Sequence, residues 1–265
     1  MEQPNKNIKL VSNKKSRVIL PNILTLIGVC IGLTSIKFAF DGKFELSIIA
    51  VIVAGIIDGL DGRIARLIQG TSKVGKELDS LTDVISFGVA PAFIMYFWSM
   101  SEIGRLGWLI SLIYVVCVAL RLARFNVNSE VEPSWRDNFF EGIPSPAGGI
   151  LVLMPLIYSF SEIQFFKPNY QIVVPALFIL IAILLISKVP TYSMKKIVVP
   201  RSTTIFLLFV VVLFFGLLLI YTFNTLIIFG ILYLVIIPVS SVHFLLIKKN
   251  KKIKDDNTDH HEDVL

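Results

Sequence analysis

Eight long apolar stretches, separated by short polar segments, dominate the chain. They cover residues 18–40, 44–69, 76–98, 107–125, 147–160, 171–187, 202–222 and 226–247. An α-helix needs about 20 mainly apolar residues to cross the hydrocarbon core of a bilayer. The pattern therefore predicts an all-α fold, a polytopic membrane helical bundle of about eight transmembrane helices. The stretch 147–160 is short for a crossing, and the Pro-Ser-Pro segment before it is a candidate for its first turn.

The polar segments predict the turns and the ends of this bundle. Short turns are expected at residues 41–43, 70–73 and 223–224, and a longer polar loop at 127–145. Residues 1–17 are predicted to be a cytoplasmic N-terminal segment and 18–247 one integral membrane domain. Residues 248–265, which are lysine-rich and then acidic, are predicted to be a disordered cytoplasmic tail.

The distribution of basic residues predicts the orientation of the helices. With eight crossings and both ends inside, all but four of the 25 Lys and Arg residues fall on the cytoplasmic side. The exceptions are Lys37, Lys43, Arg105 and Lys167. This bias is what the positive-inside rule requires. It predicts a multi-pass protein of the cell membrane whose 58–83 segment faces the cytoplasm.

Composition supports a membrane protein and argues against other classes. Hydrophobic residues make up 55% of the chain and charged residues 17%, which is too apolar for a soluble domain. The net charge of +6 would suit nucleic acid, but the basic residues flank apolar stretches, so we expect no nucleic-acid partner. Cys30 and Cys117 lie within apolar stretches, so neither a disulfide framework nor a cysteine metal site is expected. The first stretch carries Pro21 near its start and shows no pattern of a cleavable signal.

Four aspartates lie on either side of the turn predicted at residues 70–73. Asp58 and Asp61 are three residues apart, and Asp79 and Asp83 are four apart, so each pair shares one face of a helix. If the chain reverses near Gly70, two antiparallel helices bring the two pairs to the same level. The sequence therefore predicts that the four carboxylates converge.

A cluster of carboxylates beside lipid needs an explanation, because neighbouring negative charges repel one another. Either some of the acids are protonated or hard cations neutralise them. An all-oxygen cluster suits Mg²⁺ or Mn²⁺, with Ca²⁺ as a third candidate, and two ions about 4 Å apart would form a site for phosphoryl displacement. Two other interpretations are solvated acids at helix ends and the ion path of a cation transporter. The second predicts inverted repeats, which the sequence does not show.

The spacing around these aspartates resembles a known family. The string Asp58-x-x-Asp61-Gly62-x-x-Ala65-Arg66, followed by Gly75-x-x-x-Asp79-x-x-x-Asp83, resembles the signature of the CDP-alcohol phosphatidyltransferases. The resemblance implies a six-helix catalytic core, a homodimer and two divalent ions held by Asp58, Asp61, Asp79 and Asp83. It also implies that Asp83 is the general base and that Gly62 and Ala65 let the cytidine nucleotide approach the helix.

Two further residues near the signature are candidates for binding the nucleotide or its diphosphate. Arg66 is placed to pair with the diphosphate or with an aspartate. Asn22, at the interior end of the first stretch, is placed to touch the nucleotide or the metal shell, or else to cap the helix. Lys73 and Lys76 are interpreted as surface anchors.

Four other stretches resemble the membrane-integral phosphatidylserine synthases within that family. They are SFGVAPA at 86–92, LRLARFN at 120–126, FEGIPSPA at 140–147 and VPTYSMKK at 189–196. The resemblance implies transfer of a phosphatidyl group from CDP-diacylglycerol, a membrane lipid, to the hydroxyl of L-serine. A carboxylate such as that of serine favours a planar guanidinium. Arg121, Arg124 and Lys195 are therefore candidates for the acceptor site, with topology anchors as their alternative role and glycerol 3-phosphate as the alternative acceptor.

Overall fold

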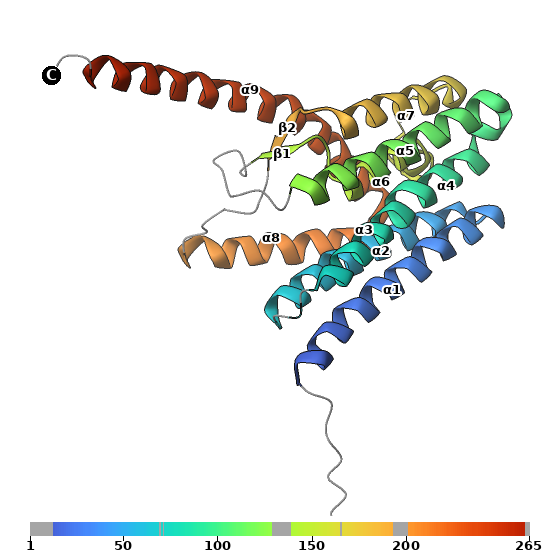
Figure 1. Cartoon of the computed structure of the whole chain (residues 1–265). Helices are drawn as coiled ribbons and strands as arrows, with labels where there is room; N and C mark the ends of the chain where they lie inside the picture. Colours follow the sequence, from blue (N-terminus) through green and yellow to red (C-terminus); the bar gives the residue numbers. More distant parts are fainter. Residues whose placement is uncertain are drawn as a thin grey trace, which may run out of the picture. The chain divides into compact units, whose positions relative to one another are not determined.

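The structure is a computed structural model that describes residues 13–68, 70, 72–128, 139–164, 166–192 and 201–262. It is almost entirely helical (Figure 1). The α-helices are α1 (Asn13–Phe40), α2 (Phe44–Leu67), α3 (Lys73–Asp83), α4 (Ala90–Trp98), α5 (Arg105–Asn128), α6 (Ser145–Phe160), α7 (Tyr170–Ile186), α8 (Arg201–Ile220) and α9 (Thr222–Glu262). The other elements are a π-helix η1 (Val84–Val89), a 3₁₀ helix η2 (Met100–Ile103) and the strands β1 (Phe139–Glu141) and β2 (Pro190–Tyr192).

The helices confirm the predicted polytopic membrane bundle. Four helical segments of the described chain are long and apolar enough to cross a membrane: Ile19–Phe40, Lys73–Trp98, Arg105–Val127 and Thr222–Phe244. Three shorter apolar helices are Ser145–Phe160, Tyr170–Ile186 and Ile205–Ile220. These seven segments correspond to seven of the eight predicted stretches. The remaining stretch forms α2, which is more polar, so each predicted stretch is helical in the part of the chain that the structure describes. The protein is membrane-integral, and α6 does begin within the Pro-Ser-Pro segment, at Ser145.

The chain divides into two compact units, Met1–Leu122 and Ala123–Leu265. In the first unit, α1 and α2 lie side by side and are joined by the predicted turn, where Gly42 has a φ of 75° (Figure 1). Helix α1 also packs against α3, η1 and α4. Fully buried side chains such as Ile48, Phe87 and Ile94 fill the space between these helices.

Glycines of α1 lie against the segment that runs from α3, which carries two of the aspartates, into η1, and the approach is very close at Gly32. A methyl group on Gly32 would lie 2.6 Å from the hydroxyl oxygen of Ser86 and 3.2 Å from its Cα. A methyl group on Gly28, one turn away, would lie 3.5 Å from the methyl group of Thr82. Small residues four apart permit this kind of close helix packing in membranes. Helix α1 therefore fixes the position of the segment that runs from α3 into η1.

The second unit contains a short antiparallel pair of strands that the sequence analysis did not predict. Strand β1 pairs with β2, with Phe140 opposite Thr191. The hydroxyl of Thr191 donates to the carbonyl of Gly142 (2.7 Å), and the hydroxyl of Ser240 on α9 donates to the carbonyl of Pro190 (2.6 Å). The end of the segment predicted as a polar loop at 127–145 is thus ordered by bonds to residues about 50 positions away in the sequence.

The break between the last two helices lies slightly before the predicted turn. The break between α8 and α9 falls at Tyr221, not at residues 223–224. The hydroxyl groups of Thr222 and Thr225 stabilise this turn by donating to carbonyls near the end of α8. Helix α9 ends at Glu262, beyond the predicted end of the eighth apolar stretch at residue 247. The assignment of residues 248–265 as a disordered cytoplasmic tail stays a prediction.

The π-helix η1 directly follows Asp83 and has a local cause. Pro91 lies four residues after Phe87 and has no N–H, so the Phe87 carbonyl has no α-helical partner. The hydroxyl of Tyr114, a fully buried residue of α5, donates to that carbonyl at 2.7 Å. The backbone N–H of Ala90 bonds the carbonyl of Ile85, five residues earlier, which is the π-helical pattern. Pro91 and Tyr114 together thus stabilise the π-helical turn that follows Asp83.

Replacing Tyr114 by Phe is expected to lower stability by about 1–3 kcal/mol, because it leaves a buried carbonyl without its donor. Thermal unfolding of the purified protein in detergent measures this. Tyr96→Phe is the matched control, since the Tyr96 ring packs edge-on against Trp108 at 5.3 Å and keeps that contact. Equal unfolding temperatures for the two variants would contradict the role given to the Tyr114 hydroxyl.

Candidate functional site

A helical hairpin in the first unit carries all four aspartates. Helix α2 supplies Asp58 and Asp61 from its last three turns, and α3 supplies Asp79 and Asp83. Helix α2 ends at Leu67, and Ser72 caps α3 by accepting a hydrogen bond from the Gly75 backbone N–H (2.9 Å). A Ser side chain at this position satisfies one of the free N–H groups of the first helical turn. The reversal predicted at residues 70–73 is therefore confirmed.

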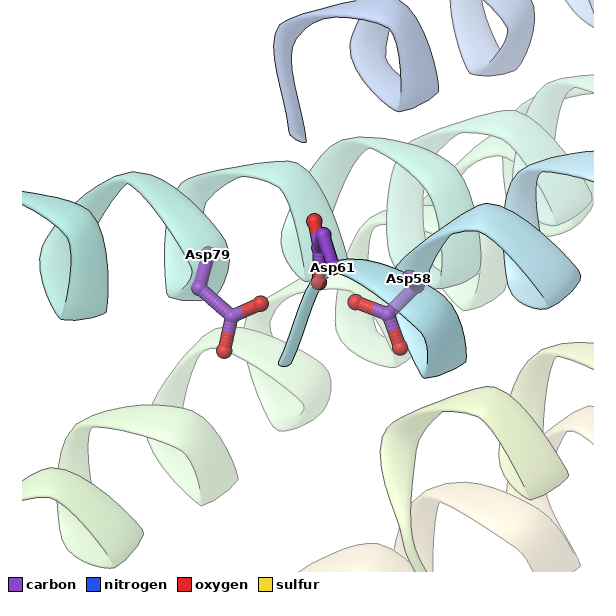
Figure 2. Close-up of side chains that lie close together, drawn as sticks. All are labelled: Asp58, Asp61 and Asp79. Carbon is purple, nitrogen blue, oxygen red and sulfur yellow. The ribbon is translucent and has the colours of Figure 1, made fainter. Parts of the chain in front are cut away.

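Three of the four carboxylates meet as the sequence predicts. One oxygen of each of Asp58, Asp61 and Asp79 lies within 4.8 Å of one oxygen of the other two. In Figure 2 the Asp61 side chain lies between those of Asp58 and Asp79, which reach toward it from α2 and α3. The Asp83 carboxyl group interacts with that of Asp58. The arrangement brings negative charge from two helices to one place.

The donor set fits a hard divalent cation. The Asp61 side chain is 3% exposed, and its Oδ1 atom is buried without a hydrogen-bond partner among the described residues. A buried carboxylate oxygen that lacks a donor is costly unless a cation takes its place. Carboxylate oxygens alone favour Mg²⁺, Mn²⁺ or Ca²⁺ over softer metals. The three clustered aspartates are thus a candidate metal centre.

The aspartates open onto a pocket of about 340 Å³. Its lining includes every residue of the predicted metal and nucleotide sites: Asn22, Asp58, Asp61, Gly62, Ala65, Arg66, Asp79 and Asp83. The sequence analysis did not single out five further lining residues as pocket residues: Pro21, Thr25, Gly70, Ser72 and Gly75. Lys76, interpreted from the sequence as a surface anchor, also lines this pocket. The pocket therefore combines acidic, basic and backbone surfaces within reach of one ligand.

Helix α1 closes one side of the pocket with Asn22 and Thr25. The Thr25 hydroxyl oxygen lies 2.6 Å from Oδ2 of Asp61 and 3.0 Å from the Pro21 carbonyl. A methyl group on Gly75 would lie 2.9 Å from Oδ1 of Asn22, so the absence of a side chain at Gly75 leaves room for that amide. The only sequence signal for Thr25 was its position one helical turn after Asn22.

Arg66 lies along the α2 wall of the pocket. Its Nε donates to the carbonyl of Gly62, one turn earlier, at 3.1 Å. Gly62 itself faces open space, because a methyl group built on it would meet no atom within 4 Å. A ligand can therefore approach the backbone of α2 closely at this point.

The residues predicted to bind the acceptor do not line the pocket. Arg121 lies on α5 within the first unit and is absent from the lining. Arg124 belongs to the second unit, where its Nη1 donates to the Ile186 carbonyl at the end of α7 (2.7 Å). Lys195 lies outside the described residues. Their predicted role in the acceptor site stays a prediction.

The protein is a membrane-integral helical bundle in which a hairpin carries a cluster of carboxylates. The cluster faces a pocket that also contains basic residues. Such a site can bind a cation together with an anionic ligand. Residues 18–186 match the family model for CDP-alcohol phosphatidyltransferase, and the chain belongs to this family. Within the described residues, that range contains α1, α2, the continuous helical segment Lys73–Trp98, α5, α6 and α7, which are six helical segments, the number in the predicted core.

Three relatives illustrate the similarity. The chain is 44% identical to a CDP-diacylglycerol–serine O-phosphatidyltransferase of Mycobacterium leprae over 137 residues, which are 51% of this chain and 45% of that protein. It is 36% identical to the protein of the same name from Helicobacter pylori over 179 residues, 68% of this chain and 74% of that protein. It is 33% identical to an archaetidylserine synthase of Methanothermobacter thermautotrophicus over 150 residues, which are 54% of this chain and 60% of that protein. The chain spans about half the length of the mycobacterial relatives that it matches.

Proposed function

We propose that the protein transfers the phosphatidyl group of CDP-diacylglycerol to the hydroxyl of L-serine, which forms phosphatidylserine and releases CMP. The observation that supports this most is the convergence of Asp58, Asp61 and Asp79 on one pocket, at the spacing of the family signature. Relatives from bacteria and an archaeon whose names state serine transfer support the choice of acceptor.

The aspartates have two roles in this proposal. Asp58, Asp61 and Asp79, with Asp83, hold two divalent ions, either Mg²⁺ or Mn²⁺. When bound, such ions neutralise the diphosphate and the departing CMP. Asp83, which also lines the pocket, accepts the proton of the serine hydroxyl as its oxygen attacks the lipid-linked phosphorus. The P–O bond to the cytidine nucleotide breaks, and CMP leaves with that electron pair.

The pocket walls bind and orient the nucleotide. Gly62 and Ala65 leave the α2 backbone accessible to it, and Arg66 and Asn22 contact its phosphates or ring. Arg66 can turn from its own helix toward the diphosphate, since its present bond to the Gly62 carbonyl is made at the protein surface. A guanidinium suits phosphate oxygens because it donates two parallel hydrogen bonds.

Replacing Gly62 by Ala is expected to raise the KM for CDP-diacylglycerol about tenfold or more, the cost of one methyl group in a close contact. The added methyl group meets no protein atom, so the protein should remain folded. Gly59→Ala on the same helix is the matched control, because Gly59 also faces open space but does not line the pocket. Steady-state CMP release measures both variants. Equal KM values would contradict close approach of the nucleotide at Gly62.

The location of the reaction follows from the charge pattern. We propose that the protein lies in the cell membrane with the pocket toward the cytoplasm, where a nucleotide head group is available, and that it acts as a homodimer. Arg121, Arg124 and Lys195 are the proposed contacts of the serine carboxylate. The family resemblance supports these assignments, and all but four of the 25 Lys and Arg residues fall on the cytoplasmic side when the chain is given this orientation.

The decisive experiment measures CMP release by the purified protein from CDP-diacylglycerol with each acceptor in turn. L-serine is expected to support turnover, whereas glycerol 3-phosphate and inositol are not. If the protein prefers glycerol 3-phosphate, the proposed acceptor is wrong but the proposed class of reaction stands. No CMP release with any alcohol, combined with cation uptake into liposomes, would favour a transporter.

A further inference from the structure

A hydroxyl group of α1 contacts one of the clustered aspartates on α2. The Oγ1 atom of Thr25 lies 2.6 Å from Oδ2 of Asp61, and both side chains are more than nine-tenths buried. Figure 2 shows Asp61 as the central member of the three clustered side chains. Thr25 therefore contacts one of the three aspartates whose oxygens lie within 4.8 Å of one another.

The two oxygens of the Asp61 carboxylate have different surroundings. Oδ2 accepts from Thr25, whereas Oδ1 is buried without a hydrogen-bond partner in the described part of the chain. The last torsion of an aspartate side chain is broad, so the backbone alone does not fix which oxygen faces a ligand. A donor on Oδ2 removes this freedom and leaves Oδ1 available for a cation.

The hydroxyl proton of Thr25 has two acceptors to choose from. The Pro21 carbonyl is 3.0 Å away, and the Asp61 carboxylate is 2.6 Å away. A charged acceptor forms the shorter and stronger hydrogen bond. The proton therefore goes to Asp61, and the Pro21 carbonyl is the alternative acceptor of the same proton.

We propose that Thr25 is a positioning residue: it orients the Asp61 carboxylate so that Oδ1 binds the divalent cation. The inference rests on the proposed function to the extent that Asp61 is a cation ligand. Hydrogen-bond partners of metal ligands raise metal affinity or activity by about 10–100-fold. Thr25 acts through Asp61 and touches neither the nucleotide nor the acceptor in this role.

The test measures Mn²⁺ binding to the purified full chain in the absence of any substrate. The EPR signal of free Mn²⁺ reports how much of the ion remains unbound. Thr25→Val keeps the shape of the side chain but removes the hydroxyl, and it is expected to weaken Mn²⁺ binding about 10–100-fold. Thr25→Ser keeps the hydroxyl and is expected to bind Mn²⁺ within a few-fold of wild type. Thr25→Ala gives a second hydroxyl-free variant if Thr25→Val does not fold.

The matched control is Thr34→Val. Thr34 lies on the same helix, and its hydroxyl donates to the Cys30 carbonyl four residues earlier (2.6 Å), but the residue is exposed and does not line the pocket. This variant is expected to bind Mn²⁺ as the wild type does and to show a similar small change in unfolding temperature to Thr25→Val. A cation effect confined to Thr25→Val then separates positioning from helix stability.

Two results would overturn the inference, and they differ. If the wild type binds Mn²⁺ and Thr25→Val binds it equally well, or if Thr25→Ser is as weak as Thr25→Val, the hydroxyl does not position Asp61. If the wild type and Asp61→Asn both fail to bind Mn²⁺, the metal site of the proposed function fails and the role of Thr25 fails with it.

Discussion

Removing divalent cations with EDTA is expected to abolish CMP release, and adding Mg²⁺ or Mn²⁺ is expected to restore it. The reason is electrostatic: the oxygens of Asp58, Asp61 and Asp79 come within 4.8 Å of one another. At an effective dielectric constant of 20, two unit charges about 4 Å apart interact by about 4 kcal/mol. Without cations this negative cluster would repel a diphosphate instead of binding it.

The metal titration has a control and a clear contradiction. Asp58→Asn and Asp61→Asn are expected to raise the Mg²⁺ concentration needed for half-maximal activity and to weaken CDP-diacylglycerol binding in parallel. The same titration with Gly59→Ala should match the wild type, because Gly59 does not line the pocket. Full turnover in a thoroughly chelated sample would rule out a metal-dependent mechanism.

Replacing Asp83 by Asn is expected to lower kcat about 10²–10⁴-fold, the usual contribution of a positioned general base. Asn keeps the size of the side chain but cannot accept the proton of serine. Binding of CDP-diacylglycerol should change less than in Asp58→Asn, because Asp83 lies outside the group of three clustered aspartates. Steady-state kinetics with L-serine, together with nucleotide binding in the absence of serine, separates the two effects.

Two outcomes would count against the base assignment. One is near wild-type turnover of serine by Asp83→Asn. The other is an equal loss of Mn²⁺ binding in all four Asp→Asn variants, which would make Asp83 a ligand of the same kind as Asp58, Asp61 and Asp79.

The sequence predicts the hairpin site well because its information is local. The pairs Asp58/Asp61 and Asp79/Asp83 lie on helices whose spacing fixes a shared face, and a Gly-containing turn at residues 70–73 joins them. Apolar length likewise predicts the helices. These features need no knowledge of which distant segments meet.

The features that the sequence does not predict depend on contacts between segments that are far apart in the sequence. Thr25 is recognisable as a pocket residue only when α1 is known to lie against α2. Strands β1 and β2 are three residues long, too short for an alternating pattern, and they pair across about 50 residues. Two arginines three residues apart indicate a shared helix face, but only the structure shows that Arg124 bonds the end of α7. Tertiary contacts decide each of these cases.

The close contact between α1 and the segment from α3 into η1 also limits how the pocket can move. Gly28 and Gly32 bring the α1 backbone against Thr82 and Ser86, the residues next to and just beyond Asp83. Separating these helices would open a gap that no flexible side chain bridges, because glycine has none. We therefore expect α1 and the acid-bearing helix to move as one rigid body during turnover. The changes of shape that admit substrate and let CMP depart are then left to side chains such as Arg66, at the exposed rim of the pocket.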